Sequence, residues 1–466
     1  MCGLHTSAAL LSFLAFPVIS LGYEVRPFKV NLSSRVSHLK ELANLTKLPE
    51  KSVLGKSGAG IDLSWLKDRR QNWLNDYDWD KEQREMNKFN HSTVDIGNMT
   101  VHFIHQRSSN PNAIPVLLTH GWPGSFYEFH EVIGPLGNPG GESNTSFHVI
   151  VPSLPGFGFT SPAPPGWSSN NTADLFNTLL TDVLGYQSYT TVAGDWGMVV
   201  TWALHNNHAD HVKAVLYTGL LPDLGPTYDQ LKADPRFADK ADSLTEEQKE
   251  RLQYNTVFTS DGFGYFIEQT TRASPATIGL ALYDNPIGQL AWIGEKYLTG
   301  DPLIGTPPST LDNNTILTSV SLYYLTGTFE TATNVYYQNQ GAFVSGLRRA
   351  ANRVPMGFAD YPYEALCAVF PFLMFSMPNS ALIRYYPKFY LEEVGNLVFY
   401  SGAYISLFMS FREVLIQGVV CLPIEHERGG HFSALDNPPA YVEDIRAMMG
   451  RWYEASTSSP LLIVAD

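Results

Sequence analysis

The stretch that most constrains the fold is residues 190–200, which read Thr-Thr-Val-Ala-Gly-Asp-Trp-Gly-Met-Val-Val. The β-branched residues predict a strand and the residues after Gly197 suit a helix, so the chain turns sharply at Asp195. Small residues two positions before and two positions after Asp195 permit this turn and leave the carboxylate at its tip. A carboxylate presented in this way can attack carbon and form an ester that water then hydrolyses. The alternative is that Asp195 only caps the following helix.

The composition predicts a globular protein with a large core. The chain has 466 residues, of which 44% are hydrophobic and 13% aromatic, so it can hold one large domain with an appendage, or two domains. Its net charge of −14 argues against a nucleic acid partner, because phosphate binding needs concentrated lysine and arginine. The sequence predicts no particular oligomeric state.

The first residues are typical of a secretory signal. Residues 8–21 form an apolar run of the length of a signal-peptide core, and small residues follow near Gly22, although no positive charge precedes the run. We therefore expect residues 1–22 to be a cleaved signal peptide, which makes the protein secreted or lumenal. The alternative is a retained anchor in the endoplasmic reticulum, and membrane association is expected only through this segment. Seven glycosylation sequons agree with passage through the secretory pathway: Asn31, Asn44, Asn90, Asn98, Asn144, Asn170 and Asn313. Cys367 and Cys421 are then either paired or two free buried thiols.

Strand and helix patterns alternate from Val101 onward, after a mainly helical N-terminal region at residues 23–107. Strands are expected at 101–105, 113–119, 147–151, 188–192, 212–217, 353–358 and 396–400. Such alternation predicts an α/β fold with a parallel, doubly wound sheet. We expect core segments at residues 108–221 and 344–466, with a helical lid, or cap, inserted at residues 222–343. Functional groups should lie at the carboxyl ends of the strands.

Two further stretches can supply groups for catalysis. His120-Gly121-Trp122-Pro123-Gly124-Ser125 follows the 113–119 strand, and its backbone N–H groups can stabilise a developing oxyanion, although a turn without that role would have a similar sequence. His431 lies on a glycine-rich loop late in the chain, where a general base is expected. His426-Glu427 before His431 superficially resembles a zinc motif, but two glycines between the histidines prevent them from sharing a helical face, so no metal site is predicted.

The acid that orients His431 should follow the strand that resumes after the lid, and both Asp360 and Glu364 satisfy this. An aspartate nucleophile needs a carbon with a leaving group, which is a halide or a strained epoxide. Opening an epoxide also requires an acid, and tyrosine hydroxyls of the lid can serve. The candidates are Tyr265, Tyr283, Tyr297, Tyr323, Tyr324, Tyr336 and Tyr337.

Taken together, these motifs resemble those of the microsomal-type epoxide hydrolases over nearly the whole chain. The resemblance covers the N-terminal region of that family at residues 25–30, 76–89 and 101–105, the HGWPGS motif at 120–125, the GDWG motif at 194–197, the cap motif at Gly264-Tyr265, the motif of Gly327-Thr328 and Tyr336, the acid motif at 361–364 and GGHF at 429–432. It implies an α/β-hydrolase fold with a helical cap and an N-terminal meander.

The resemblance also implies the role of each residue. Tyr265 and Tyr336 hydrogen-bond the epoxide oxygen while Asp195 attacks a ring carbon to form an alkyl ester. His431, oriented by Glu364 in preference to Asp360, then deprotonates water that hydrolyses the ester. The N–H groups of Trp122 and Trp196 form the oxyanion hole. The substrate is a small epoxide, the product is a vicinal diol, and neither a cofactor nor a metal is required.

The chain departs from this family in the 67 positions that separate Glu364 from His431, because related sequences space them more closely. Apolar stretches at residues 369–377 and 401–424 account for the difference, either as surface excursions or as retained non-coding sequence. If the second stretch displaces His431, the protein would be a ligand-binding homologue without turnover. The other alternative is a haloalkane dehalogenase, although those enzymes lack the N-terminal region and the paired cap tyrosines.

Overall fold

The structure is a computed structural model of the full chain. It describes residues 22–53, 60–141, 143–219, 225–246, 248–249, 252, 275–300, 304–340, 342, 348–361, 386–401, 426 and 428–458. Several predictions lie outside these residues: the signal segment to residue 21, the two cysteines Cys367 and Cys421, the cap residue Tyr265, Glu364, and the apolar stretches 369–377 and 402–424. Among the described residues, no helix combines the length and the apolar character needed to cross a membrane.

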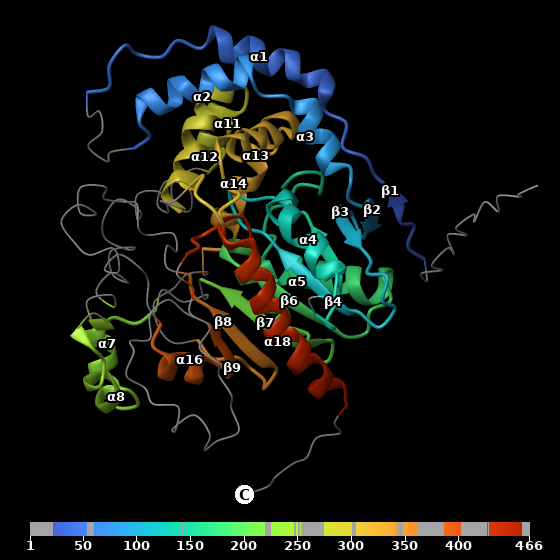
Figure 1. The fold of residues 1–466 in the computed structure, drawn as a ribbon, viewed down its shortest axis with the longest axis vertical. Helices are drawn as coiled ribbons and strands as arrows, with labels where there is room; N and C mark the ends of the chain where they lie inside the picture. The colour runs from blue at the N-terminus through green and yellow to red at the C-terminus, as the bar shows by residue number, and fades with distance from the viewer. Residues whose placement is uncertain are drawn as a thin grey trace, which may run out of the picture.

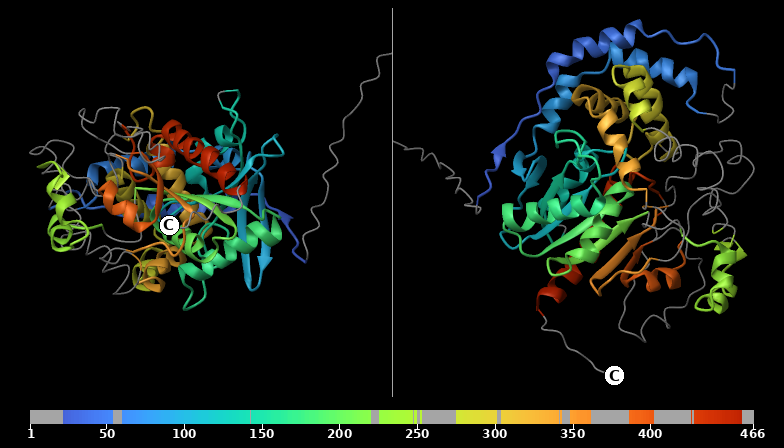
Figure 2. Two further views of the ribbon diagram at one scale, coloured as in Figure 1. Left: turned by 90° about the horizontal axis from the view of Figure 1, so that it is seen from below. Right: turned by 180° about the vertical axis from the view of Figure 1, so that it is seen from behind.

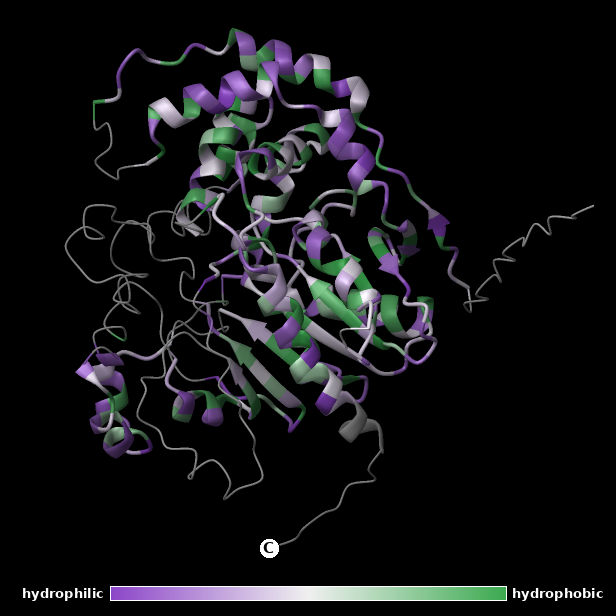
Figure 3. Cartoon of the chain, in the orientation of Figure 1, coloured by the Kyte–Doolittle hydropathy of each residue, from purple (hydrophilic) through white to green (hydrophobic). Residues whose placement is uncertain are grey.

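A nine-stranded sheet forms the centre of the molecule, with strand order β1-β2-β3-β5-β4-β6-β7-β8-β9. The strands are β1 (Arg26–Pro27), β2 (His91–Ile96), β3 (Met99–Gln106), β4 (Ile114–Thr119), β5 (Phe147–Pro152), β6 (Tyr189–Ala193), β7 (Val212–Thr218), β8 (Pro355–Ala359) and β9 (Asn396–Ser401). From β5 to β9 all neighbours are parallel. Strands β4, β5 and β6 are buried along their whole length, and the hydrophobic residues of the central strands are visible in Figure 3.

Helices cover both faces of this sheet. The helices are α1 (Val36–Leu45), α2 (Leu63–Asn75), α3 (Trp79–Met86), α4 (His130–Gly137), α5 (Ser169–Thr178), α6 (Asp195–Asn207), α7 (Tyr228–Ala233), α8 (Ala238–Asp242), α11 (Pro275–Leu282), α12 (Pro286–Gly300), α13 (Asn313–Thr326), α14 (Phe329–Gln338), α16 (Lys388–Val394), α17 (Ser433–Asp436) and α18 (Pro438–Ser458). Helices α4 and α18 pack on one face and α5 and α6 on the other (Figure 2). The architecture is therefore the predicted α/β-hydrolase fold.

The expectation of a fully parallel sheet is wrong at the N-terminal edge. Strands β1, β2 and β3 pair antiparallel with one another, and β3 pairs antiparallel with β5. The N-terminal region is thus not only helical. Its β2–β3 hairpin closes through the two residues Gly97 and Asn98, and Gly97 has the positive φ of 58° that such a tight connection requires.

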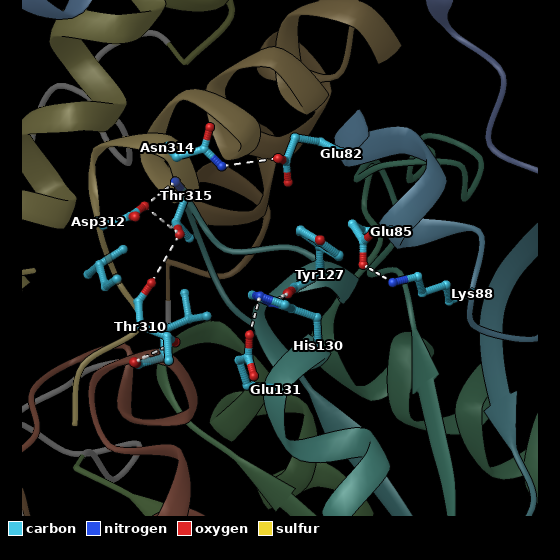
Figure 4. Close-up of polar contacts among 12 residues, drawn as sticks. Glu82, Glu85, Lys88, Tyr127, His130, Glu131, Thr310, Asp312, Asn314 and Thr315 are labelled. Atoms are coloured by element: carbon cyan, nitrogen blue, oxygen red, sulfur yellow. Dashed lines mark hydrogen bonds and ion pairs between the residues drawn. The ribbon is translucent and has the colours of Figure 1, made fainter. Parts of the chain in front are cut away.

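The N-terminal helices hold the cap helix α13 in place above the sheet (Figure 1). The Trp73 indole N–H donates to Ser321 Oγ at 2.9 Å, and Tyr77 OH donates to Thr318 Oγ1 at 3.2 Å. At the start of α13, the Asn314 amide donates to the largely buried Glu82 carboxylate at 3.1 Å (Figure 4). Since α14 follows α13 after two residues, this packing also fixes the helix that carries Tyr336.

Candidate active site

Asp195 lies at the sharp turn that the sequence predicts. Strand β6 ends at Ala193 and helix α6 begins at Asp195, which has a left-handed φ of 46°. That conformation is strained for a residue with a side chain and is typical of functional positions. Two residues later the turn passes so close to β4 that a Cβ on Gly197 would lie 2.1 Å from the Thr119 carbonyl oxygen. Only glycine fits there, which accounts for the small residue after the turn.

The turn after β4 supplies a hydrogen bond to the Asp195 carboxylate. The backbone N–H of Trp122 donates to Asp195 Oδ1 at 2.7 Å. A Cβ on Gly121 would lie 2.1 Å from the same oxygen, so the loop approaches the carboxylate closely only because residue 121 is glycine. The predicted 120–125 turn and the 194–197 turn therefore meet at one carboxylate oxygen.

His431 faces the other oxygen of that carboxylate. Its Nε2 lies 3.5 Å from Asp195 Oδ2, and both side chains are mostly shielded from solvent. The backbone N–H of His431 donates to the Gly300 carbonyl at 3.1 Å, which ties the histidine loop to the end of cap helix α12. His431 therefore lies beside Asp195, as the proposed reaction requires.

Tyr336, one of the two predicted cap acids, lies beside the two tryptophans that flank this carboxylate. It is buried on α14 and packs edge-on against the rings of Trp196, at 4.8 Å between centroids, and Trp122, at 5.9 Å. Burial raises the pKa of Tyr336 well above its ordinary value, and the negative charge of Asp195 raises it further, whereas a hydrogen bond with the Trp196 side chain lowers it. The hydroxyl therefore stays protonated and can act as a donor at neutral pH.

The other described cap tyrosines have different partners. Tyr297 OH donates to the Pro123 carbonyl at 3.3 Å, and Tyr323 OH donates to the Gly124 carbonyl at 2.8 Å. These two bonds join the cap to the loop beside Asp195 and so support the site's shape. The remaining tyrosines point elsewhere: Tyr324 donates to Asp284, while Tyr283 and Tyr337 are exposed.

His120, the first residue of the 120–125 turn, supports the loop backbone. Its Nδ1 lies 2.9 Å from the Gly121 carbonyl oxygen, and its Nε2 accepts the Leu154 N–H at 3.2 Å. Burial lowers the pKa of His120 to about 4, so the imidazole is neutral at pH 7. A neutral ring with Nδ1–H can donate to one backbone group and accept from the other.

Of the two acids predicted to orient His431, only Asp360 is among the described residues. Asp360 is buried directly after β8, and its backbone N–H donates to the Ser401 carbonyl at 2.7 Å. Glu364 lies outside the described residues, as does Tyr265, so the choice between the two acids and the pairing of Tyr265 with Tyr336 stay predictions.

A small pocket is lined by Asp195 and His431 and also contains residues that the sequence did not single out. Its described lining comprises Gly121, Trp122, Glu128, Gly194, Asp195, Thr218, His431, Phe432, Ser433 and Tyr441. Glu128 adds a second carboxylate to the pocket. Its position three residues after the predicted 120–125 turn carries no sequence signal that separates it from an ordinary surface glutamate.

Comparison with known proteins agrees with the fold. The family described as epoxide hydrolase N terminus matches residues 25–129, and the alpha/beta hydrolase fold family matches residues 114–256. A Stigmatella aurantiaca protein assigned as an epoxide hydrolase is 32% identical over 429 residues, covering 91% of this chain and 84% of that protein. The chain belongs to the epoxide hydrolase family. Epoxide hydrolase 1 of Sus scrofa is 29% identical, covering 93% of this chain and 90% of that one.

Solved epoxide hydrolases share the architecture. The Aspergillus niger epoxide hydrolase superposes with a TM-score of 0.70 at 29% identity, covering 92% of this chain and 97% of its own. The juvenile hormone epoxide hydrolase of Bombyx mori has the same fold, with a TM-score of 0.70 at 23% identity. The predicted family, fold and enzyme class are therefore confirmed, and the haloalkane dehalogenase and binding-only alternatives are not favoured.

Proposed function

We propose that this epoxide hydrolase opens its substrate through a covalent ester on Asp195. The observation that carries the proposal is the placement of the carboxylate between Trp122 N–H, at 2.7 Å from Oδ1, and His431 Nε2, at 3.5 Å from Oδ2. Oδ2 attacks a ring carbon, and the carbon–oxygen bond of the epoxide breaks. Oδ1 becomes the ester carbonyl oxygen and remains on the Trp122 N–H, which with the Trp196 N–H forms the oxyanion hole of the second step.

Tyr336, paired with Tyr265, protonates the epoxide oxygen as the ring opens. Support comes from the buried, protonated hydroxyl of Tyr336 beside the Asp195 charge. In the second step His431 removes a proton from water, and the resulting hydroxide attacks the Asp195 carbonyl carbon. Glu364 orients the imidazole. The ester then collapses to the free carboxylate and a vicinal diol, so that one water is consumed for each epoxide and no cofactor takes part.

The proposal is tested by trapping the ester. Wild-type enzyme is quenched in acid during turnover of styrene oxide and digested, and the masses of its peptides are measured by mass spectrometry. We expect the peptide that contains Asp195 to gain the mass of one substrate molecule. An adduct on the peptide of Glu128, the other carboxylate of the pocket, or turnover without any adduct in repeated early quenches, would contradict the assignment of the nucleophile.

Replacing Tyr336 with phenylalanine tests the proposed acid. Loss of the hydroxyl should lower kcat/KM for epoxides about 100-fold, the usual size of a general-acid contribution, and adding Tyr265→Phe should lower it further. Tyr337→Phe is the matched control, because Tyr337 is the neighbouring residue on α14 and is exposed. Undiminished hydrolysis by the double variant would rule out the tyrosine pair.

The secretory location is part of the same proposal. All seven sequon asparagines, spread from Asn31 to Asn313, are exposed on the structure, as attachment of a glycan requires. We propose that the protein enters the secretory pathway through residues 1–22, is N-glycosylated, and acts on small epoxides there, with any membrane contact made only by that segment.

A further inference from the structure

A buried polar cluster beside the loop that carries His431 has no part in the chemistry described so far. Its centre is Asp444 on helix α18, whose Oδ2 lies 3.0 Å from Tyr361 OH, 3.1 Å from Ser401 Oγ and 2.8 Å from His426 Nε2. All four residues are at most 5% exposed. A carboxylate this deep in a protein needs such donors, because an uncompensated buried charge is strongly unfavourable.

The three donors come from segments that lead into the catalytic loops. Tyr361 lies two residues after β8, at the start of the segment in which Glu364 follows, and Ser401 is the last residue of the neighbouring strand β9. His426 lies five positions before His431. The Asp444 carboxylate on α18 therefore binds the segment just after β8, the last residue of β9 and the beginning of the histidine loop.

The histidine loop rests on the ring of Tyr361. The imidazole of His426 stacks on that ring, with centroids 4.7 Å apart and planes inclined by 3°. Gly429 has a φ of 118°, and a Cβ there would lie 2.5 Å from Tyr361 Cδ1, so the loop backbone lies directly against the ring. A shift of Tyr361 or His426 would therefore move the loop two residues before His431.

We propose that Asp444 is a positioning residue for the second half of the reaction. By holding Tyr361, Ser401 and His426, it keeps His431 within reach of the ester carbonyl. This inference rests on the proposed roles of Asp195 and His431. Because ester formation needs Asp195 and the tyrosines rather than His431, loosening the cluster should slow ester hydrolysis and leave ester formation nearly unchanged.

The test separates the two steps in Asp444→Asn. Asparagine keeps the size of the side chain, but it replaces one oxygen by an NH₂ group and removes the charge that the three donors share. In single turnovers of styrene oxide followed by rapid quench, we expect ester formation within about twofold of wild type and ester hydrolysis slowed about 100-fold, the effect of a displacement near 1 Å. The alkyl-enzyme should therefore accumulate, which a general loss of stability would not produce.

Ile445→Val is the matched control, because Ile445 is the next residue on α18 and is fully buried outside the cluster. It should leave the ratio of the two rates at the wild-type value. Equal slowing of both steps, or no slowing, in folded Asp444→Asn would overturn the inference. If that variant does not fold, Ser401→Ala, which removes one donor, is judged by the same ratio and the same outcomes. Failure of wild type to form any ester would instead overturn the proposed role of Asp195.

Discussion

Replacing Asp195 with alanine should abolish epoxide turnover, with kcat/KM reduced at least about 10⁴-fold, as expected for loss of a nucleophile. The variant retains the backbone N–H of Trp122 and the imidazole of His431, but neither group can form the ester. The measurement is the initial rate of diol formation from styrene oxide, together with the thermal unfolding temperature. Alanine in the left-handed conformation of residue 195 costs about 1 kcal/mol, so we expect the protein to fold.

Asp174→Ala provides the matched control for this experiment. Asp174 has a side chain that is 64% exposed and an ion-pair partner, His208, away from the site, and its removal should leave turnover unchanged. Residual activity of Asp195→Ala within tenfold of wild type would show that the 190–200 turn presents its carboxylate for another purpose, such as capping α6.

Replacing His431 with glutamine should separate the two steps of the reaction. The variant should still consume one epoxide per active site, because Asp195 and the cap tyrosines are intact, and should then stop as the alkyl ester. Steady-state kcat should fall about 10³-fold or more, since general bases contribute factors of this size. The measurement is the mass of the quenched protein, which should show one substrate bound to nearly every molecule.

His38→Gln is the control, because the side chain of His38 is 56% exposed and faces Asp284 on the surface. It should behave as wild type in both rate and mass. A His431→Gln variant that turns over normally, or one that never forms an ester, would contradict the proposal that Asp195 forms the ester and His431 activates the water that hydrolyses it.

The local parts of the site were predictable because they depend on neighbouring residues in the chain. The turn at Asp195 follows from β-branched residues before it and Gly197 after it, which the close Thr119 carbonyl confirms. The family resemblance then indicated that residues 236 positions apart, Asp195 and His431, act together. The distance of 3.5 Å between His431 Nε2 and Asp195 Oδ2 depends on how β8, β9 and the cap position the histidine loop. The spacing of residues in the sequence does not define that position.

The antiparallel edge of the sheet was missed for an identifiable reason. Strand β2 is short, carries polar residues and follows a charged helix, so its periodicity did not separate it from the helical region. The two-residue Gly97-Asn98 connection was the available signal, because such pairs favour tight hairpins.

Side-chain partners were less predictable than the fold. Tyr297 and Tyr323 could not be separated from Tyr336 by spacing, since their hydroxyls differ only in which tertiary partner they meet. The sequence around Asp444 also did not indicate that this residue accepts three hydrogen bonds in the core. It is a single acid among the buried Val442, Ile445 and Met448 of α18, and only the folded arrangement shows its three donors.

The most direct test of the ester mechanism is a single turnover with enzyme in excess over styrene oxide, run in water labelled with heavy oxygen. If Asp195 supplies the oxygen that opens the ring, the first diol should contain no label, and the label should be found in the Asp195 carboxylate after digestion. If water attacks the epoxide directly, the first diol would carry the label and Asp195 would remain unlabelled, which would contradict the mechanism.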